Sequence, residues 1–147
     1  MKINPYKHKE RYFSWKEEVK KKGIPRISEF NSDLILRYIE NMEHRINIST
    51  TNIKGARSYT RLNTLREKVI FFAKRFNEVY ETDKITDITE EQLIKFFSGM
   101  RSGKIKRKDG KEYRSASDFV KIFKAFWHWH QKVNREKGLK LFISLEL

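Results

Sequence analysis

The amino-acid sequence predicts an all-α protein. Only two Pro and six Gly interrupt its 147 residues, and five long segments place apolar side chains at the three- and four-residue spacing of a helix. Hydrophobic residues make up 38% of the chain and include eleven Phe, six Tyr and three Trp, which is enough to form a core. The length is that of one ordinary domain. We therefore expect one compact bundle of helices.

The first three expected helices span residues 6–22, 32–47 and 55–80. Residues 23–25, Gly-Ile-Pro, end the first helix, and a polar linker at residues 49–54 separates the second from the third. Each helix has one apolar face that we expect to lie in the core. These faces are Tyr12, Trp15 and Val19 in the first, Ile35, Tyr38, Ile39, Met42 and Ile46 in the second, and Tyr59, Leu62, Leu65, Val69, Phe72, Phe76 and Val79 in the third.

The fourth helix begins at Thr89, because Thr89 and Gln92 fit a capping box, and it ends before Gly103. Residues 104–114 form a basic loop around the turn dipeptide Asp109-Gly110, or a short hairpin. The fifth helix is capped by Ser115 or Ser117 and ends at Gly138. The inner faces are Leu93, Phe96, Phe97 and Met100 in the fourth helix, and Phe119, Ile122, Phe123, Phe126, Trp129 or His130, and Val133 in the fifth.

The net charge points to a polyanionic partner. Thirty-three Lys and Arg against nineteen Asp and Glu give +14, and nucleic acid is the first polyanion to consider. The chain has no Cys, which excludes disulfides, thiolate zinc sites and cysteine nucleophiles, and which suggests an intracellular protein. No stretch approaches the roughly 18 apolar residues of a membrane span, and the N-terminus has no signal-peptide core. We expect a cytoplasmic protein without membrane contact.

Charge is distributed unevenly along the chain. Residues 27–53 carry a net charge of −2 and residues 77–100 carry −4, so these segments should face away from a polyanion. Residues 54–76 carry +6, residues 101–114 carry +5 and residues 115–140 carry +4. The third helix, the loop and the fifth helix therefore form the expected binding surface.

Helical spacing refines that surface. One face of the third helix carries Arg57, Arg61, Thr64, Lys68 and Arg75, and one face of the fifth carries Lys121, Lys124, His128, Lys132 and Arg135. Such faces can serve solubility alone, but few acidic residues accompany these two. If the two helices pack antiparallel, both faces border one surface. The complete set of expected DNA-binding residues is Lys54, Arg57, Arg61, Asn63, Thr64, Lys68, Arg75, Lys104, Lys106, Arg107, Lys108, Lys111, Arg114, Ser115, Lys121, Lys124, His128 and Lys132, of which Asn63, Thr64, Arg114 and Ser115 are the candidates for base contacts.

No catalytic or metal site is evident in the sequence. His128 and His130 are two residues apart, which places them about 200° apart on a helix, so they cannot share a metal ion. His8 and His44 stand alone, and phosphate-loop and nucleophile-elbow motifs are absent. A tyrosine that attacks DNA phosphate needs Arg and His groups around it, and none of the six tyrosines has such a cluster. Cofactors and metals are therefore not expected. Lys20, Lys21 and Lys22 suit the end of a helix and offer a secondary, nonspecific phosphate contact.

Three segments resemble segments of a known protein family, and they occur in the same order along the chain as in that family. They are residues 56–76 (ARSYTRLNTLREKVIFFAKRF), residues 86–97 (TDITEEQLIKFF) and residues 113–129 (YRSASDFVKIFKAFWHW). The first is similar to the first long helix of the core-binding domain of tyrosine recombinases, the phage integrase family, and especially of its archaeal members. The second resembles that domain's threonine-capped acidic helix start, and the third its helix with a polar cap and an F-W-x-W end. The likeness covers about residues 30–137.

The resemblance implies a four-helix, SAM-like bundle at residues 27–138, with an additional N-terminal helix at 1–26 and a tail or linker at 139–147. Such a domain binds one side of a DNA duplex and positions the recombinase, with other recombinase protomers as further partners on the DNA. Family members cut DNA with a separate catalytic domain. The chain is then a fragment of a recombinase or a stand-alone relative, and it should not cut DNA by itself.

Other functions stay open. A helical protein-interaction module would use the acidic faces of the second and fourth helices, and a nonspecific nucleic-acid-binding module would use the same basic surface. The sequence contains none of the usual RNA-binding motifs. A nuclease would need a metal-binding cluster of carboxylate or His side chains, and no such cluster is evident in the sequence.

Overall fold

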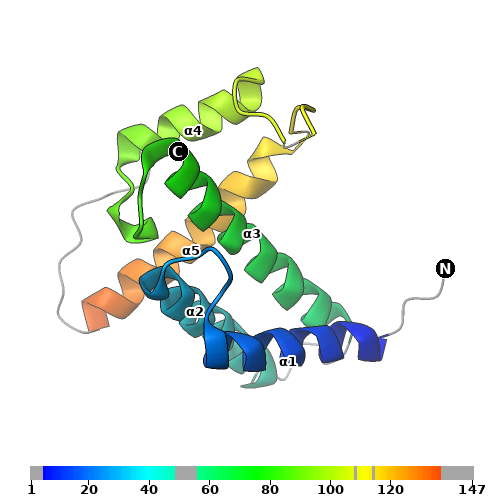
Figure 1. Cartoon of the computed structure of the whole chain (residues 1–147). Coiled ribbons are helices and arrows are strands. Elements are labelled where there is room, and N and C mark those ends of the chain that lie inside the picture. The colour runs from blue at the N-terminus through cyan, green and yellow to red at the C-terminus, as the bar shows by residue number, and fades with distance from the viewer. Residues whose placement is uncertain (1–4, 49–55, 108, 114, 137–147) are drawn as a thin grey trace. The chain divides into compact units, whose positions relative to one another are not determined.

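The computed structural model describes residues 5–48, 56–107, 109–113 and 115–136, although not the side chains of residues 5, 6, 46–48, 56, 57, 135 and 136. Over these residues the chain forms α1 (Pro5–Lys22), α2 (Glu29–Ile48), α3 (Ala56–Tyr80), α4 (Glu90–Ser102) and α5 (Ala116–Glu136), with a 3₁₀ turn, η1 (Ile85–Asp87), before α4 (Figure 1). No strand occurs in the described ranges. The all-α prediction is confirmed, and no described helix is both long and apolar enough to cross a bilayer.

The helix boundaries follow local signals. Around α4, Thr89 forms the expected capping box, in which its hydroxyl accepts from the Gln92 amide at 3.1 Å and the Gln92 side chain accepts from the Thr89 amide at 3.0 Å. Helix α2 begins three residues earlier than predicted. The reason is Ser28, whose hydroxyl accepts from the Asn31 amide at 3.2 Å and so provides an N-cap that the sequence analysis missed.

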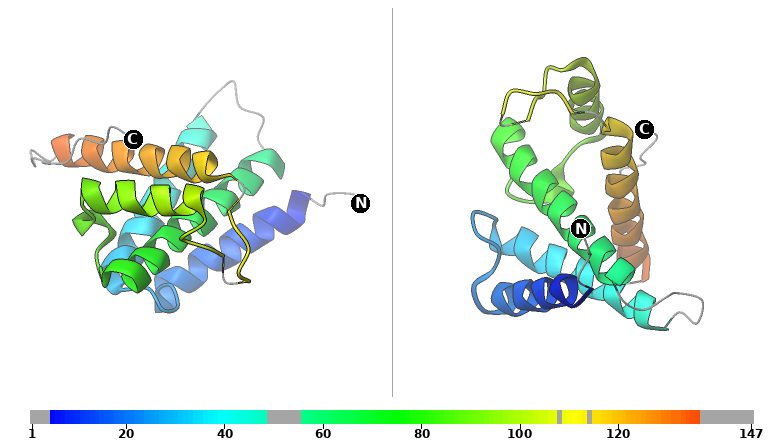
Figure 2. Two further views of the ribbon diagram at one scale, coloured as in Figure 1. Left: turned by 90° about the horizontal axis from the view of Figure 1, so that it is seen from above. Right: turned by 90° about the vertical axis from the view of Figure 1, so that its right-hand side faces the viewer.

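The chain divides into two compact units, Met1–Ile85 and Thr86–Leu147. In the first unit, α1 and α2 both pack against α3, which crosses them (Figures 1 and 2). Helix α1 is thus part of the same unit as α2 and α3. The domain boundaries expected at residues 26 and 138 stay predictions.

The core of the first unit consists largely of the expected faces. Its buried apolar side chains are Tyr12, Val19, Ile24, Leu34, Ile35, Tyr38, Ile39, Leu62, Leu65, Val69, Phe72, Ala73, Phe76 and Ile85. Val79, expected in the stripe of α3, is instead 43% exposed. Asn77 and Glu78 are exposed as well, so the last turn of α3 lies at the surface on several sides. In this turn the spacing of apolar residues therefore does not predict which side chains are buried.

In the second unit, α4 and α5 pack antiparallel (Figure 2). All four expected inner residues of α4 are buried, and the Phe97 ring lies edge-on to Phe123 of α5 at 6.2 Å between centroids. Trp127, which the sequence analysis did not place in the core, is only 1% exposed and stacks on Phe123 at 6.0 Å. The apolar face of α5 is therefore wide enough to bury both Trp127 and Trp129.

The basic loop is a turn and not a hairpin over its described residues. The Gly110 amide donates to the Arg107 carbonyl at 2.9 Å, and the Arg107 amide donates to the Lys111 carbonyl at 2.9 Å. At the start of the loop, the Ile105 amide donates to the Gly99 carbonyl of α4 at 2.9 Å. A Cβ atom at Gly99 would lie 2.9 Å from the Ile105 side chain, so this close approach requires glycine.

Candidate nucleic-acid interface

The outward side of α5 carries three lysines and a histidine, which together we call the α5 basic face: Lys121, Lys124, His128 and Lys132. Lys121, His128 and Lys132 are exposed, and Lys124 is partly exposed. They project away from the buried aromatic side of the helix, because they recur every three or four residues. Asp118 is the one carboxylate on the described part of this face, and it lies in the first turn, where a negative charge suits the helix dipole.

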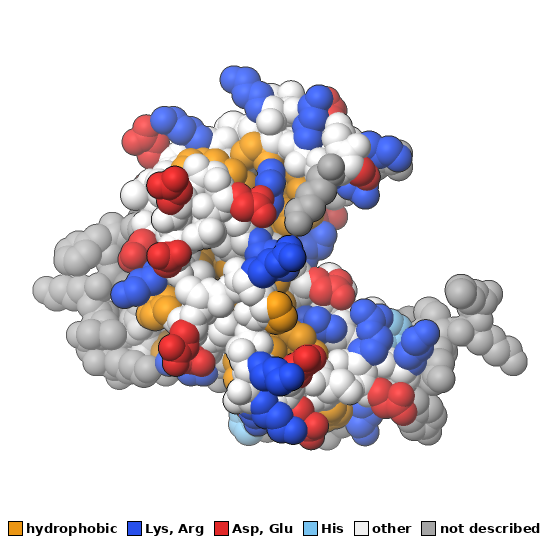
Figure 3. Space-filling view, viewed as in Figure 1, with side chains coloured by type: hydrophobic (Ala, Val, Ile, Leu, Met, Phe, Trp, Pro, Cys, Tyr) orange, Lys and Arg blue, Asp and Glu red, His pale blue; other side chains and the backbone are white. Residues whose placement is uncertain are grey.

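The loop before α5 adds a second group of cations in the same unit. Lys104, Lys106, Arg107 and Lys111 are all exposed, as is Ser115. Arg107 has an ion pair with Asp109 at 3.1 Å, in which both side chains remain about half exposed. Figure 3 shows Lys and Arg side chains gathered over the end of α4 and this loop, at the top of the view. Lys108 and Arg114 lie outside the described residues.

The basic face of α3 is less continuous than predicted. Arg61 and Thr64 are exposed, and Lys68 is partly exposed. Arg75 instead pairs with Glu78 at 2.8 Å and is only 19% exposed at its side chain. The expectation that this face lacks acidic partners is therefore wrong at Arg75. Lys54 and the side chain of Arg57 lie outside what the structure describes.

Asn63 has a structural environment. It is 5% exposed, its amide group donates to the His8 carbonyl of α1 at 3.0 Å, and its oxygen accepts from Arg66 Nε at 2.8 Å. The Arg66 guanidinium also lies over the Trp15 ring at 5.1 Å, and burial lowers its pKa. Asn63 thus joins α1 to α3 and has no exposed surface for a base edge, so we remove it from the candidate interface.

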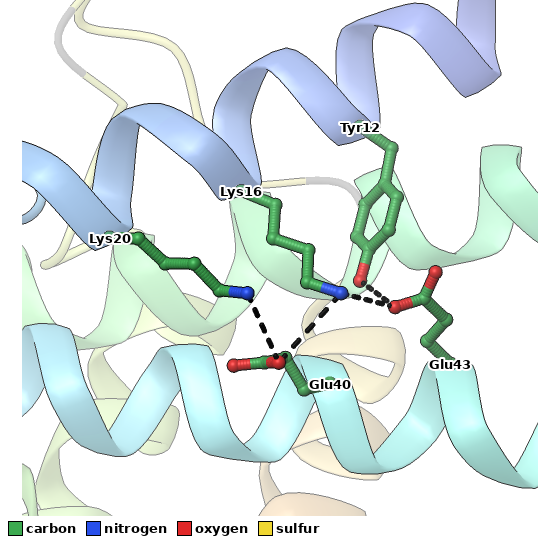
Figure 4. A network of polar contacts seen from close by, with 5 residues as sticks. All are labelled: Tyr12, Lys16, Lys20, Glu40 and Glu43. Carbon is green, nitrogen blue, oxygen red and sulfur yellow. Dashed lines mark hydrogen bonds and ion pairs between the residues drawn. The ribbon is translucent and has the colours of Figure 1, made fainter.

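Two of the four carboxylates of α2, Glu40 and Glu43, face α1. Lys16 of α1 lies 2.9 Å from Glu43 and 3.7 Å from Glu40, and Lys20 lies 3.8 Å from Glu40 (Figure 4). The hydroxyl of Tyr12 donates to Glu43 at 3.0 Å. Burial and the neighbouring Glu43 raise the pKa of Tyr12, so this hydroxyl stays a donor. The network engages Glu40 and Glu43 within the unit, together with Lys20, one of the secondary phosphate candidates, whereas Glu29 and Asp33 of α2 are exposed outside it.

In the described residues, the side chains that could bind a metal ion or act in catalysis do not form a cluster. The described residues contain no cluster of three His, Cys, Asp or Glu side chains that could hold a metal ion. Burial raises the pKa of Tyr38 and Tyr59, as it does for Tyr12, which is the opposite of what activates a tyrosine nucleophile. On α5, His128 is exposed, whereas His130 stacks on Phe126 at 6.5 Å between centroids.

Arg101 and Arg45 are two of the exposed basic residues that were not among the expected DNA-binding residues. Arg101 is exposed at the end of α4, next to the basic loop, and only its inclusion in the charge count of residues 101–114 signalled it. Arg45 is exposed on α2, a helix that was expected to face away from a polyanion because of its net negative charge. Since Glu40 and Glu43 are engaged by α1, net charge is a poor guide to the other sides of α2.

Comparison with known proteins identifies no relative: no family model matches the chain, and neither a curated protein nor a solved structure does.

Proposed function

We propose that this chain binds double-stranded DNA, and that it does so as the core-binding domain of a tyrosine recombinase positions its enzyme. The observation that carries the proposal is the α5 basic face, whose exposed side chains Lys121, His128 and Lys132 have no carboxylate partner in the described residues. Some basic side chains elsewhere in the described residues pair with carboxylates, as between α1 and α2. A run of unpaired cations over several helical turns is the expected footprint of a phosphate backbone.

The proposed binding energy comes from phosphate contacts. Each Lys or Arg that neutralises a phosphate releases a condensed counterion, so affinity should fall steeply with salt. Such contacts set the position of the protein on the duplex and carry little sequence information. With Asn63 removed, Thr64 and Ser115 are the described candidates that expose a polar side chain for base contacts.

The burial pattern supports DNA binding over the protein-interaction alternative. That alternative relied on free acidic faces, but Glu40 and Glu43 of α2 are engaged by Lys16 and Lys20. A partner protein with a basic surface would have to displace those lysines first. Lys121 and Lys132 of α5 and Lys104 and Lys111 of the loop have no carboxylate partner to displace in the described residues.

Charge-reversal variants test the proposal in the full chain. The double variant Lys121→Glu with Lys132→Glu changes the α5 basic face, and Lys7→Glu with Lys9→Glu makes the same charge change on exposed residues of α1 that are not among the phosphate candidates. Each phosphate contact contributes about 0.9 to the slope of log K against log salt, which is a factor of about eight at 0.1 M salt, so losing two contacts should weaken duplex binding by roughly sixtyfold. The α1 variant should lose far less. Equal losses, with melting temperatures unchanged, would mean that the attraction is diffuse.

We further propose that the chain alone does not cleave DNA. The buried tyrosines support this, since Tyr12 and Tyr38 are each at most 1% exposed and cannot reach a phosphate in the folded state. Incubation with supercoiled plasmid, followed by denaturing electrophoresis, should give neither nicks nor a covalent adduct. A tyrosine-linked DNA product would contradict this assignment.

A further inference from the structure

Two aromatic rings from different helices meet at the surface of the first unit. Phe13 of α1 is 36% exposed, and its ring lies 5.7 Å, between centroids, from the ring of the partly exposed Tyr59 of α3. The buried Tyr12 contacts both rings, at 5.3 Å from Phe13 and 5.8 Å from Tyr59. Tyr12 therefore anchors Phe13 and Tyr59, which we call the aromatic pair, to the core.

A lysine ammonium group lies over each ring of the aromatic pair. Lys9 Nζ is 5.8 Å from the centroid of Tyr59, and Lys16 Nζ is 6.0 Å from the centroid of Phe13. An ion pair with Glu43 at 2.9 Å holds Lys16 in this place. Aromatic rings at the surface with cations beside them are the combination on which single strands of nucleic acid bind, because every base has a face that can stack on a ring.

Phe30 of α2 shows which feature is particular to the aromatic pair. It is 40% exposed, and Lys84 Nζ lies over its ring at 5.1 Å, so it matches Phe13 in exposure and in its cation. Within the part of the chain that the structure describes, however, no second aromatic ring contacts Phe30. Exposure and a nearby cation are thus shared by both phenylalanines, whereas the contact between two surface rings from two helices belongs to Phe13 and Tyr59.

We infer that the aromatic pair is a stacking site for an unpaired base of a single DNA strand. This ligand goes beyond the proposed duplex binding, because the bases of a duplex are already stacked on one another. Glu10 and Glu17 are exposed on α1 as well, three residues before and four residues after Phe13. The two ammonium groups offset these carboxylates, so the strand is not repelled, and stacking supplies most of the binding energy.

The test compares the affinity of the full chain for two single strands of equal length. One is an oligothymidine of about 12 nucleotides, and the other is an abasic strand that has the same phosphates and no bases. The ratio of the two affinities, measured by anisotropy at one salt concentration, cancels the contribution of the phosphates. Stacking of one base on an aromatic side chain changes affinity by about fivefold to hundredfold, so the wild-type chain should prefer oligothymidine by about tenfold.

The decisive variant is Phe13→Leu, with Phe30→Leu as its matched control. Each replaces a ring of similar exposure, which has a lysine over it, by another apolar side chain. Phe13→Leu should lower the preference for oligothymidine to about twofold or less, and Tyr59→Leu should do the same, whereas Phe30→Leu should leave it unchanged. Phe13→Trp should keep or raise the preference, because it retains a ring at this position.

Duplex affinity separates this site from the proposed function. Phe13→Leu should bind duplex DNA as the wild-type chain does, which also shows that the variant is folded. A wild-type chain without preference for oligothymidine, or equal declines in Phe13→Leu and Phe30→Leu, would overturn the stacking site alone. A wild-type chain that does not bind the duplex would instead overturn the proposed function, while the ratio for the two single strands still decides the stacking site.

Discussion

Replacing Asn63 by Ala should destabilise the first unit and leave intrinsic DNA affinity unchanged. The side chain makes two hydrogen bonds, one to the His8 carbonyl at 3.0 Å and one from Arg66 Nε at 2.8 Å. A neutral hydrogen bond contributes roughly 0.5–1.5 kcal/mol and one to a charged group roughly 1.5–3 kcal/mol. Because the Arg66 site is only partly buried, we take the lower part of each range and expect a loss of about 2–3 kcal/mol.

The assay is thermal unfolding followed by circular dichroism, together with duplex-binding titrations. For a unit of this size, 1 kcal/mol corresponds to roughly 4–8 °C, so the melting temperature should fall by about 10 °C or more. The substitution Asn63→Asp keeps an acceptor for Arg66 and loses the donor to His8, so it should cost about half as much. Below the transition, DNA affinity should equal that of the wild-type chain.

Thr64→Ala is the matched control. Thr64 is exposed and its hydroxyl donates to the Thr60 carbonyl of its own helix at 3.0 Å, so its loss should change stability by no more than about 0.5 kcal/mol. The reasoning would be refuted if Asn63→Ala melts like the wild-type chain while its affinity or sequence preference for DNA declines. That result would restore Asn63 to the interface.

Three further substitutions test the packing. Tyr12→Phe should reduce the decline in stability as pH rises above about 10, because the raised pKa of Tyr12 makes only the unfolded tyrosine release its proton there, while Tyr38 and Tyr59 keep part of the decline. Urea unfolding at pH 8 and pH 11 measures this change, and a decline equal to that of the wild-type chain would contradict it. Gly103→Ala and Gly110→Ala should each destabilise the protein in a urea melt, because both glycines have positive φ (80° and 82°), which Ala rarely adopts; an unchanged melt at either position would contradict that backbone conformation. Phe123→Ala should destabilise the second unit by about 3–5 kcal/mol, and a loss below 1 kcal/mol would argue against the α4–α5 packing.

Local signals in the sequence predicted much of the fold. The Thr89 capping box, the stop at Gly103 and the turn at Asp109-Gly110 each depend on a few neighbouring residues, and all three occur in the structure. The apolar residues that were expected to be buried on α3 are buried from Leu62 to Phe76, because this face of the helix packs against the core. The expectation was wrong at Val79, which is exposed at the end of the helix. The spacing of apolar residues along one helix does not predict where the neighbouring helices end.

The candidate site was harder to predict, because exposure and pairing depend on which helices meet. The pairing of Arg75 with Glu78 was readable, since residues three apart are neighbours on a helix. Asn63 also carried a signal, because it lies two residues from Arg61 and therefore about 200° away from the basic face. The engagement of Glu40 by α1 was not readable, because it requires knowing that α1 packs beside α2.

The most direct test of the central proposal is the salt dependence of duplex binding by the full chain. Anisotropy titrations of a duplex of about 20 base pairs at several salt concentrations give the slope of log K against log salt. Neutralisation of about five to seven phosphates predicts a slope of roughly −4 to −6, with little dependence on the sequence of the duplex. A slope near zero, or tighter binding of single-stranded RNA than of duplex DNA, would contradict the proposal.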